Sequence, residues 1–486
     1  MYIQRIRLKN FKAFKDEEVF DVDGKHLLIC GNNGSGKSSL HYALHVFFQS
    51  SKKGETYKKY FIDSKDKIFG TESLLNIYGD PNDYLIELSV KQDDKKIIKY
   101  QIRPTIDVDA ESHQHQNIVN SDYASDFICH RLLVNFYNFR NSEDANIWSI
   151  FEKEIFPYWI DDVKGITFEQ WLNEIKTEFN QLSQETEVIV DDSAIAEDKR
   201  LSQKRKKKFN KESPEYKVIQ DKIKDFNNKF WAFYNSIKER INEILSHFLT
   251  DEKIEVDLDY RVPLDTNQIY EWQWNIPELI IKVKNNGEFI QKPHVFLNEA
   301  RLTALALSIR LAMFDKKFKG TGSDVIKLLV MDDLLISLDM DFRMKLINYI
   351  QEQQNVGGSF EGYQIFILTH DKGLFEVLKN TLAKDVKQWK WFEFFENNKY
   401  PIVRSEDYKN PIILEDKSLL EIAEEYLNGV KKNDGSKRII VKEKSYELCA
   451  LFLRKQVEQI LKCFFDPECK DIFRFKILEN LSRGLS

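Results

Sequence analysis

Residues 31–38 read Gly-Asn-Asn-Gly-Ser-Gly-Lys-Ser, and no other stretch limits so strongly what this chain can fold into. The pattern G-x-x-x-x-G-K-S is that of a phosphate-binding loop, which joins a buried strand to a helix. Residues 25–30 are short and largely apolar like a buried strand, and residues 39–48 have the pattern of a helix. A chance glycine-rich turn is the alternative, but it would not require both flanking elements. The sequence therefore predicts an α/β domain that binds a nucleotide.

The glycines of this loop allow the backbone to wrap closely around phosphate oxygens, with its N–H groups and the helix N-terminus facing the anion. Lys37 would lie against the β- and γ-phosphates, and the Ser38 hydroxyl would hold Mg²⁺. We therefore expect ATP and Mg²⁺ as cofactors. The expected nucleotide-binding residues are Gly31, Asn32, Asn33, Gly34, Ser35, Gly36, Lys37, Ser38 and Ser39.

Composition limits the class of protein further. The net charge of −6 gives no overall attraction to nucleic acid, so any such site must be a local patch. The five cysteines are scattered without a C-x-x-C pair, which argues for a reduced, intracellular protein and against a zinc site or a disulfide framework. No apolar run reaches membrane-spanning length, and the N-terminus lacks the apolar region of a signal peptide. We expect a cytoplasmic protein without a membrane partner.

The segments near the loop predict an antiparallel sheet beside the nucleotide site. Residues 2–20 have the pattern of a strand, a turn and a second strand, and residues 61–102 add further alternating segments. Residues 107–120 are polar and predict a loop. Residues 125–159 have a helical and aromatic pattern.

Two long helices are expected in the middle of the chain. Apolar residues recur at helical spacing over residues 168–182, and a polar stretch follows at 183–214. A second helix of about 34 residues then carries a heptad-like apolar seam. Two helices separated by a polar tip predict an antiparallel hairpin inserted into the nucleotide domain, with a compact helical subdomain as the alternative. The seam consists of Ile219, Ile223, Phe226, Phe230, Phe233, Ile237, Ile241, Ile244 and Phe248.

Two further regions are candidates for contact with partners. A basic cluster at the polar tip would contact a nucleic-acid backbone, or else be a solvated tip. From residue 411 to the end the chain has the pattern of amphipathic helices, which suits a docking or oligomerisation module. The basic cluster consists of Lys204, Arg205, Lys206, Lys207 and Lys208.

Strand patterns resume at residues 253–258 and 278–283, and a helix is expected over residues 298–314. Two apolar segments, 325–331 and 364–369, then predict buried parallel strands that each end in polar residues. Ligands in α/β folds bind at the carboxyl ends of such strands.

Three side chains at these strand ends are candidates for chemistry. Asp332 is the carboxylate expected to hold Mg²⁺, directly or through water. Asp333 stands where a general base for the attacking water is needed, with a turn or N-cap aspartate as the alternative. His370 could contact a γ-phosphate or the water, although a lone histidine is more often structural. We therefore expect Asp333 and His370 to be catalytic, and Ser38 and Asp332 to be the metal ligands.

The order of these motifs resembles that of the ABC-type ATPases of the SMC, RecF, RecN and OLD group. The resemblance implies that residues 297–301 are the signature motif, which reaches the ATP of a partner subunit. It also implies that residues 337–339 are the D-loop and that His370 is the switch histidine. The motifs are the loop at 31–38, Leu297-Asn298-Glu299-Ala300-Arg301, Asp332-Asp333, Ser337-Leu338-Asp339 and Leu368-Thr369-His370.

The chain departs from the pattern of this group in two places. Asn298 and Ala300 stand where the group usually has Ser and Gly. Asp333 replaces the usual Glu, and a carboxylate one methylene shorter would place the water poorly and slow hydrolysis. Candidates for the Q-loop are Gln114, Gln116 and residues 137–140.

The resemblance implies an ATPase head that a helical hairpin splits into two lobes, followed by a C-terminal helical region. The expected domains are residues 1–165, the N-terminal lobe with the phosphate-binding loop, and residues 166–250, the hairpin. Residues 251–410 would form the C-terminal lobe, and residues 411–486 the docking or oligomerisation region.

Three functions are compatible with these features. The first is an ATPase that dimerises around ATP, senses or handles nucleic acid and controls a partner effector, as stand-alone relatives do in bacterial anti-phage systems. It would form a homodimer or a higher homo-oligomer. The second is a RecF- or RecN-like DNA-repair ATPase that acts as a clamp on DNA. The third is a nuclease with an unrecognised active site, although no acidic TOPRIM cluster, H-N-H or zinc pattern is visible. His113 and His115 are better explained by a solvated loop than by a metal site.

Overall fold

The computed structural model describes residues 1–63, 65–66, 70–92, 96–129, 133–161, 163–185, 213–250, 252–266, 274–314, 324–333, 338, 340–382, 387–396, 412–415, 450, 453–454 and 457. The basic cluster 204–208, Ser337, Asp339 and most of the region 411–486 lie outside the described residues. The roles and structures expected for them therefore stay predictions.

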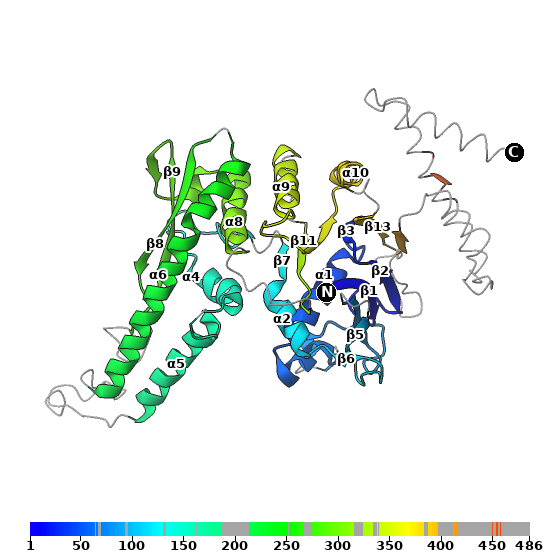
Figure 1. Ribbon diagram of the computed structural model, residues 1–486, viewed down its shortest axis with the longest axis horizontal. Coiled ribbons are helices and arrows are strands. Elements are labelled where there is room, and N and C mark those ends of the chain that lie inside the picture. Colours follow the sequence, from blue (N-terminus) through cyan, green and yellow to red (C-terminus); the bar gives the residue numbers. More distant parts are fainter. Residues whose placement is uncertain are drawn as a thin grey trace, which may run out of the picture.

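A six-stranded sheet forms the centre of the nucleotide domain, with the strand order β14-β13-β3-β12-β11-β7 (Figure 1). All neighbouring strands pair in parallel except β14, which runs antiparallel to β13. The interior strands are buried on both faces, as parallel strands covered by helices are. This confirms the predicted α/β class. The strands are β3 (His26–Gly31), β7 (Asp126–Cys129), β11 (Leu328–Asp332), β12 (Gln364–Thr369), β13 (Trp389–Phe395) and β14 (Ile412–Glu415).

A second sheet of five strands shares a core with the first and has the order β2-β1-β4-β5-β6. Its main pairs are antiparallel, as predicted for residues 2–20 and 61–102. The helix α1 (Lys37–Ser50) belongs to the same core, because its Leu40 and Phe47 are part of the buried cluster that includes Ile6 and Ile29. This core fixes the helix that begins at the phosphate-binding loop. The strands are β1 (Tyr2–Lys9), β2 (Glu18–Asp21), β4 (Leu85–Lys91), β5 (Ile97–Ile102) and β6 (Glu111–Ser112), with 3₁₀ turns η1 (Gly54–Phe61) and η2 (Gly70–Glu72).

Two long helices, α5 (Phe168–Glu185) and α6 (Pro214–Phe248), extend to one side of the sheets (Figure 1). The rings of Trp171 and Phe226 lie 5.4 Å apart, and Glu178 pairs with Lys222 at 2.6 Å. Because higher numbers on one helix meet lower numbers on the other, the helices pack antiparallel. Every predicted seam residue of α6 is buried. Ser213 begins α6 by accepting a hydrogen bond from the Tyr216 N–H.

A third, antiparallel sheet of the order β10-β9-β8 follows the long helices in the sequence. It consists of β8 (Ile254–Val262), β9 (Glu278–Asn285) and β10 (Glu288–Ile290). After α7 (Pro293–Phe296), helix α8 (Glu299–Phe314) packs against α6 and is buried from Leu302 onward. A helix that is apolar on all sides belongs in a core. α9 (Met340–Gln353) and α10 (Lys372–Thr381) connect the strands β11, β12 and β13.

The loop predicted for residues 107–120 is wrong at its end. The chain forms the short strand β6 and then the helix α2 (Gln116–Ala124), which His115 caps by accepting a hydrogen bond from the Asn117 N–H. The helix was not predicted because it has few apolar residues and therefore no clear helical pattern. Its Ile118 is nevertheless fully buried. His113 is also buried, at 1% exposure, so the expectation of a solvated histidine is corrected.

The helical pattern predicted for residues 125–159 fails at its start. Residues 126–129 form β7, which pairs in parallel with β11. These four residues, Asp-Phe-Ile-Cys, do not alternate between polar and apolar, which is the pattern by which a strand is recognised. The helical part begins later, with α4 (Trp148–Ile150), a π-helical turn η3 (Phe151–Ile155) and the 3₁₀ turn η4 (Phe156–Tyr158).

The prediction that the chain is helical from residue 411 onward is contradicted at residues 412–415. These residues form β14, because the edge of β13 offers them an antiparallel partner. Among the described residues, no helix is both long and apolar enough to cross a membrane.

Candidate active site

The phosphate-binding loop lies between the end of β3 and the start of α1. Gly34 and Gly36 have φ of 86° and 94°, in the left-handed region that favours glycine. A Cβ on Gly31 would lie 2.4 Å from Ser35 Oγ and 2.6 Å from the Phe394 carbonyl oxygen, so only glycine fits there. The glycines of the loop thus stand where the backbone conformation or the close approach of other atoms favours glycine.

Lys37 is folded into the loop, with 3% of its surface exposed. Its Nζ donates to the carbonyl oxygens of Gly31 at 2.6 Å and Asn32 at 3.4 Å. The ammonium group is therefore held where phosphates would bind, and it could exchange these carbonyls for phosphate oxygens.

Asp332 ends β11 beside the loop. The Ser38 hydroxyl hydrogen bonds to its carboxylate, while burial and then the neighbouring Asp333 raise the pKa of Asp332 to about 6. Its Oδ1 is buried and has no hydrogen-bond partner among the described residues. A hydroxyl and a carboxylate are ligands that Mg²⁺ prefers. Ser38 and Asp332 therefore fit the expected metal ion.

Asp333 and His370 touch each other at the ends of the neighbouring strands β11 and β12. Asp333 Oδ1 accepts a hydrogen bond from the His370 backbone N–H at 2.8 Å, and it lies 2.9 Å from His370 Nδ1. Asp333 has φ of 49°, and its own N–H donates to the Leu368 carbonyl at 3.0 Å. This turn directs the carboxylate toward the histidine. The structure thus places the two proposed catalytic side chains together, next to Asp332.

Residues 297–301 lie at the N-terminus of α8. Asn298 Oδ1 accepts a hydrogen bond from the Arg301 N–H, and the Arg301 guanidinium pairs with Glu252 at 2.7 Å. Leu297 is buried, whereas Asn298 and Glu299 are exposed. The segment therefore caps its own helix and presents its first residues at the surface, in a part of the fold separate from α1 (Figure 1).

The remaining expected site residues are engaged elsewhere or lie outside the described part. Leu338 is buried, and its carbonyl accepts a hydrogen bond from Arg343 Nε at 2.8 Å. The side chain of Gln114 donates to the Gly54 carbonyl, and that of Gln116 to Asn120. Neither contact lies in the loop at residues 31–38, so neither glutamine gains support as the Q-loop residue.

His41 is a residue of the site that the sequence analysis missed. It lies on α1, and its Nδ1 is 3.8 Å from Asp332 Oδ2. Burial, and then the nearby His45, lower the pKa of His41 to about 3, so its ring is neutral at pH 7. The spacing could have found it, since positions i and i+3 share a helix face and Ser38 is three residues earlier.

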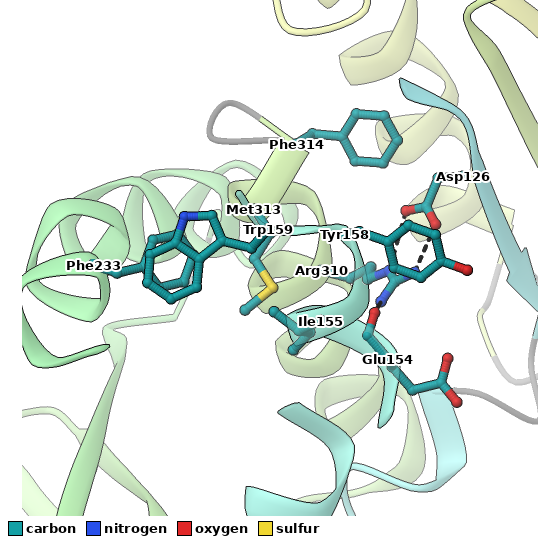
Figure 2. A pocket seen from close by; sticks show the side chains of 9 residues that line it. All are labelled: Asp126, Glu154, Ile155, Tyr158, Trp159, Phe233, Arg310, Met313 and Phe314. Carbon is teal, nitrogen blue, oxygen red and sulfur yellow. Dashed lines mark hydrogen bonds and ion pairs between the residues drawn. The ribbon is translucent and has the colours of Figure 1, made fainter. Parts of the chain in front are cut away.

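A buried ion pair ties α8 to the edge of the central sheet (Figure 2). Arg310 on α8 donates to both carboxylate oxygens of Asp126, at 2.6 and 3.1 Å, and to the Glu154 carbonyl at 2.8 Å. Tyr158 lies against the pair, and Trp159, Phe233 and Met313 line the apolar end of the same pocket. The strand held in this way, β7, is the neighbour of β11, which carries Asp332.

The fold and the site together define a P-loop ATPase. The family model for the AAA ATPase domain matches residues 1–374, and the chain belongs to this family. A comparison with curated proteins gives no significant match.

Solved structures are similar at low identity. An Smc head domain with an extended coiled coil, bound to the C-terminal domain of ScpA, from Pyrococcus furiosus, is 17% identical, with a TM-score of 0.43; the match covers 87% of this chain and 99% of that one. An SmcHead bound to the C-winged helix domain of ScpA is 13% identical over 87% and 100%, with a TM-score of 0.41. The recombination mediator RecF with ATP is 16% identical over 81% and 95%, with a TM-score of 0.42. The assignment as an ATPase therefore rests on the family match and on the residues of the site.

Proposed function

We propose that this ATPase hydrolyses ATP at the edge of the central sheet with the residues named above. The observation that carries the proposal is the meeting of five side chains at the carboxyl ends of β3, β12 and β11. A cation, a hydroxyl, two carboxylates and an imidazole converge there, which is a set suited to phosphoryl transfer to water. The five residues are Lys37, Ser38, Asp332, Asp333 and His370.

Each residue has a role that follows from its contacts. Lys37 would release the loop carbonyls and bind phosphate oxygens. Ser38 and Asp332 would hold Mg²⁺, which when bound neutralises phosphate charge. Asp333 would accept the proton of the attacking water, and His370 would orient that carboxylate through its 2.9 Å contact.

The test of this proposal is nucleotide binding and turnover in Lys37→Ala. The substitution removes the phosphate contact, so ATP binding measured by fluorescent-nucleotide titration should fall below detection. The circular dichroism spectrum should be preserved, because alanine favours the first turn of α1, where Lys37 lies, and the lost hydrogen bonds are those to the loop carbonyls of Gly31 and Asn32. ATP affinity equal to that of the wild type would refute the assignment.

We further propose that two chains share each ATP site and that the signature segment of one completes the loop of the other. Support comes from the exposed start of α8 and from Phe296 just before it, which is 72% exposed. We also propose the domain boundaries expected from the sequence, namely residues 1–165 and 251–410 for the two lobes of the ATPase head, 166–250 for the hairpin and 411–486 for the C-terminal region.

Downstream of hydrolysis, we propose control of a separate effector in anti-phage defence, with the basic cluster at 204–208 as a nucleic-acid contact. This part is supported by the motif order and its resemblance to stand-alone ATPases of such systems. A phage-plating assay on cells that carry this gene and its genomic neighbours tests it, with Lys37→Ala as the control. Sensitivity to DNA damage without any effect on phage would favour the repair role instead.

A further inference from the structure

His41 lies on the buried side of the metal-binding carboxylate. Ser38 and His41 are one helical turn apart on α1 and both face β11, where Ser38 hydrogen bonds to Asp332. His41 Nδ1 and Asp332 Oδ2 are 3.8 Å apart, which is too far for a hydrogen bond but close enough for a small movement to make one. A neutral imidazole has one N–H to donate.

Both ring nitrogens of His41 are buried without a hydrogen-bond partner among the described residues, and so is Asp332 Oδ1. The ring is held by its neighbours: it meets Phe127 edge-on at 5.8 Å and lies parallel to His45 at 6.2 Å. It therefore cannot turn to solvent for a partner. Buried polar atoms left unpaired in a native structure need an explanation, and here a carboxylate oxygen of Asp332 lies 3.8 Å from His41 Nδ1.

We propose that His41 is a positioning residue of the Mg²⁺ site, whose Nδ1–H donates to Asp332 Oδ2 when nucleotide and metal are bound. This bond would leave Oδ1 and the Ser38 hydroxyl facing the metal. The inference rests on the proposed function, because it requires the metal site. Outer hydrogen bonds of this kind fix metal-binding carboxylates, and losing one typically lowers metal affinity by about 10- to 100-fold.

Three substitutions separate this role from simple packing. His41→Asn carries an N–H at about the position of Nδ1, His41→Gln carries one near the position of Nε2, and His41→Leu keeps the volume without any donor. The readout is Mn²⁺ affinity of the full chain with ADP, from the electron paramagnetic resonance signal of free Mn²⁺. We expect affinity to fall about 10- to 100-fold in the Leu and Gln variants and to change less than about threefold in the Asn variant.

His113→Leu is the matched control. His113 is another buried histidine, and its ring packs against that of Tyr57, with ring centroids 4.5 Å apart. Its replacement should leave Mn²⁺ affinity unchanged. ADP affinity without metal should be the same in all these variants.

The outcomes distinguish failure of the inference from failure of the site. Equal Mn²⁺ affinity in the wild type and His41→Leu, or equal loss in the Asn and Leu variants, would overturn the role of His41 while the ATPase assignment stands. Nucleotide binding that is unaffected by Lys37→Ala would overturn both. Should the Leu variant fail to fold, the contrast between Asn and Gln decides.

Discussion

The carboxylate of Asp333 is one methylene shorter than the Glu that the resemblance leads one to expect. In the structure, Asp333 Oδ1 accepts a hydrogen bond from the backbone N–H of His370 and lies 2.9 Å from Nδ1 of the same residue. The positive φ of Asp333 turns the side chain toward that histidine. The shorter side chain is thus held by a specific neighbour, and the two residues are expected to act as a unit.

Asp333→Asn tests the assignment of the base. Asn tolerates the left-handed backbone conformation of this position, and the substitution keeps the shape but removes the proton acceptor. ATP binding should stay within about twofold of the wild type, whereas kcat should fall about 10²- to 10⁴-fold. Turnover and bound ATP are measured by phosphate release and filter binding. A wild-type turnover rate would show that another group is the base.

His113 predicts a pH dependence of stability. Burial lowers its pKa to about 4, below the value of about 6.5 in an unfolded chain. As the pH falls through 6.5, the unfolded state binds the proton first, so stability is lost between pH 6.5 and 4. At pH 5 this loss is about 2 kcal/mol. Urea unfolding gives the free energy of unfolding of the wild type and of His113→Leu at each pH. As the pH falls from 7.5 to 5, this free energy should fall more in the wild type, so that the variant approaches or exceeds the wild type in stability. Parallel curves would contradict the expected shift.

The site residues that could be predicted from the sequence are those in contiguous motifs. Residues that come together only in the folded chain were missed. Lys37 and Ser38 follow from the loop pattern, and Asp332 from its place after an apolar strand. His41 could have been noticed from its spacing to Ser38. The pair Asp126–Arg310 could not, because the two residues are 184 positions apart and each looks like an ordinary surface charge in the sequence.

Among the secondary-structure elements, α8 is connected to the central sheet through β7. Its N-terminus carries the proposed signature segment, and its interior is fixed to β7 by the buried pair of Arg310 and Asp126. Because β7 pairs with β11, the position of α8 is tied to the strand that ends in Asp332. We therefore expect a displacement of the proposed signature segment to change the position of Asp332.

Arg310→Met tests this connection. It leaves the Asp126 carboxylate buried without its charge partner, so the free energy of unfolding should fall by about 3–5 kcal/mol. The double variant Arg310→Met/Asp126→Asn removes both charges and should recover much of that loss. Urea unfolding measures both. A double variant no more stable than the single one would show that the arginine acts through packing alone.

The elements that the sequence predicted well are those with a long, regular pattern. The seam of α6 repeats over many turns, and β11 and β12 are uninterrupted apolar segments. β7 was missed since its four residues gain their structure from pairing with β11 and not from any pattern of their own. α2 was missed for a related reason, because only a few of its side chains face the core.

At the scale of the whole molecule, the proposed signature segment caps α8 while the phosphate-binding loop precedes α1, and the two helices belong to separate parts of the fold (Figure 1). Asn298 and Glu299 are exposed at the start of α8. The start of a helix favours anions, so this segment would suit a γ-phosphate held by a second copy.

Mixing two inactive variants tests the shared site. Lys37→Ala removes the phosphate contact, and Ala300→Glu places a negative charge where the partner's phosphate would lie. A mixed dimer has one site with both lesions and one with neither, so partial ATPase activity should return. Each variant mixed with itself is the control. If exchange of subunits is verified and no activity returns, each chain works alone.

The 35 residues of α6 give it a length of about 50 Å. Near one end, Phe248 packs against Phe342 of α9 at 5.1 Å, and Arg240 donates to the Tyr349 hydroxyl at 3.0 Å. α9 is the first helix after Asp332 and Asp333. A tilt of about 5° at this end of so long a rod would carry the opposite end through about 4 Å. We therefore expect a small rotation of α6 where it contacts α9 to become a large displacement at the opposite end of the helix.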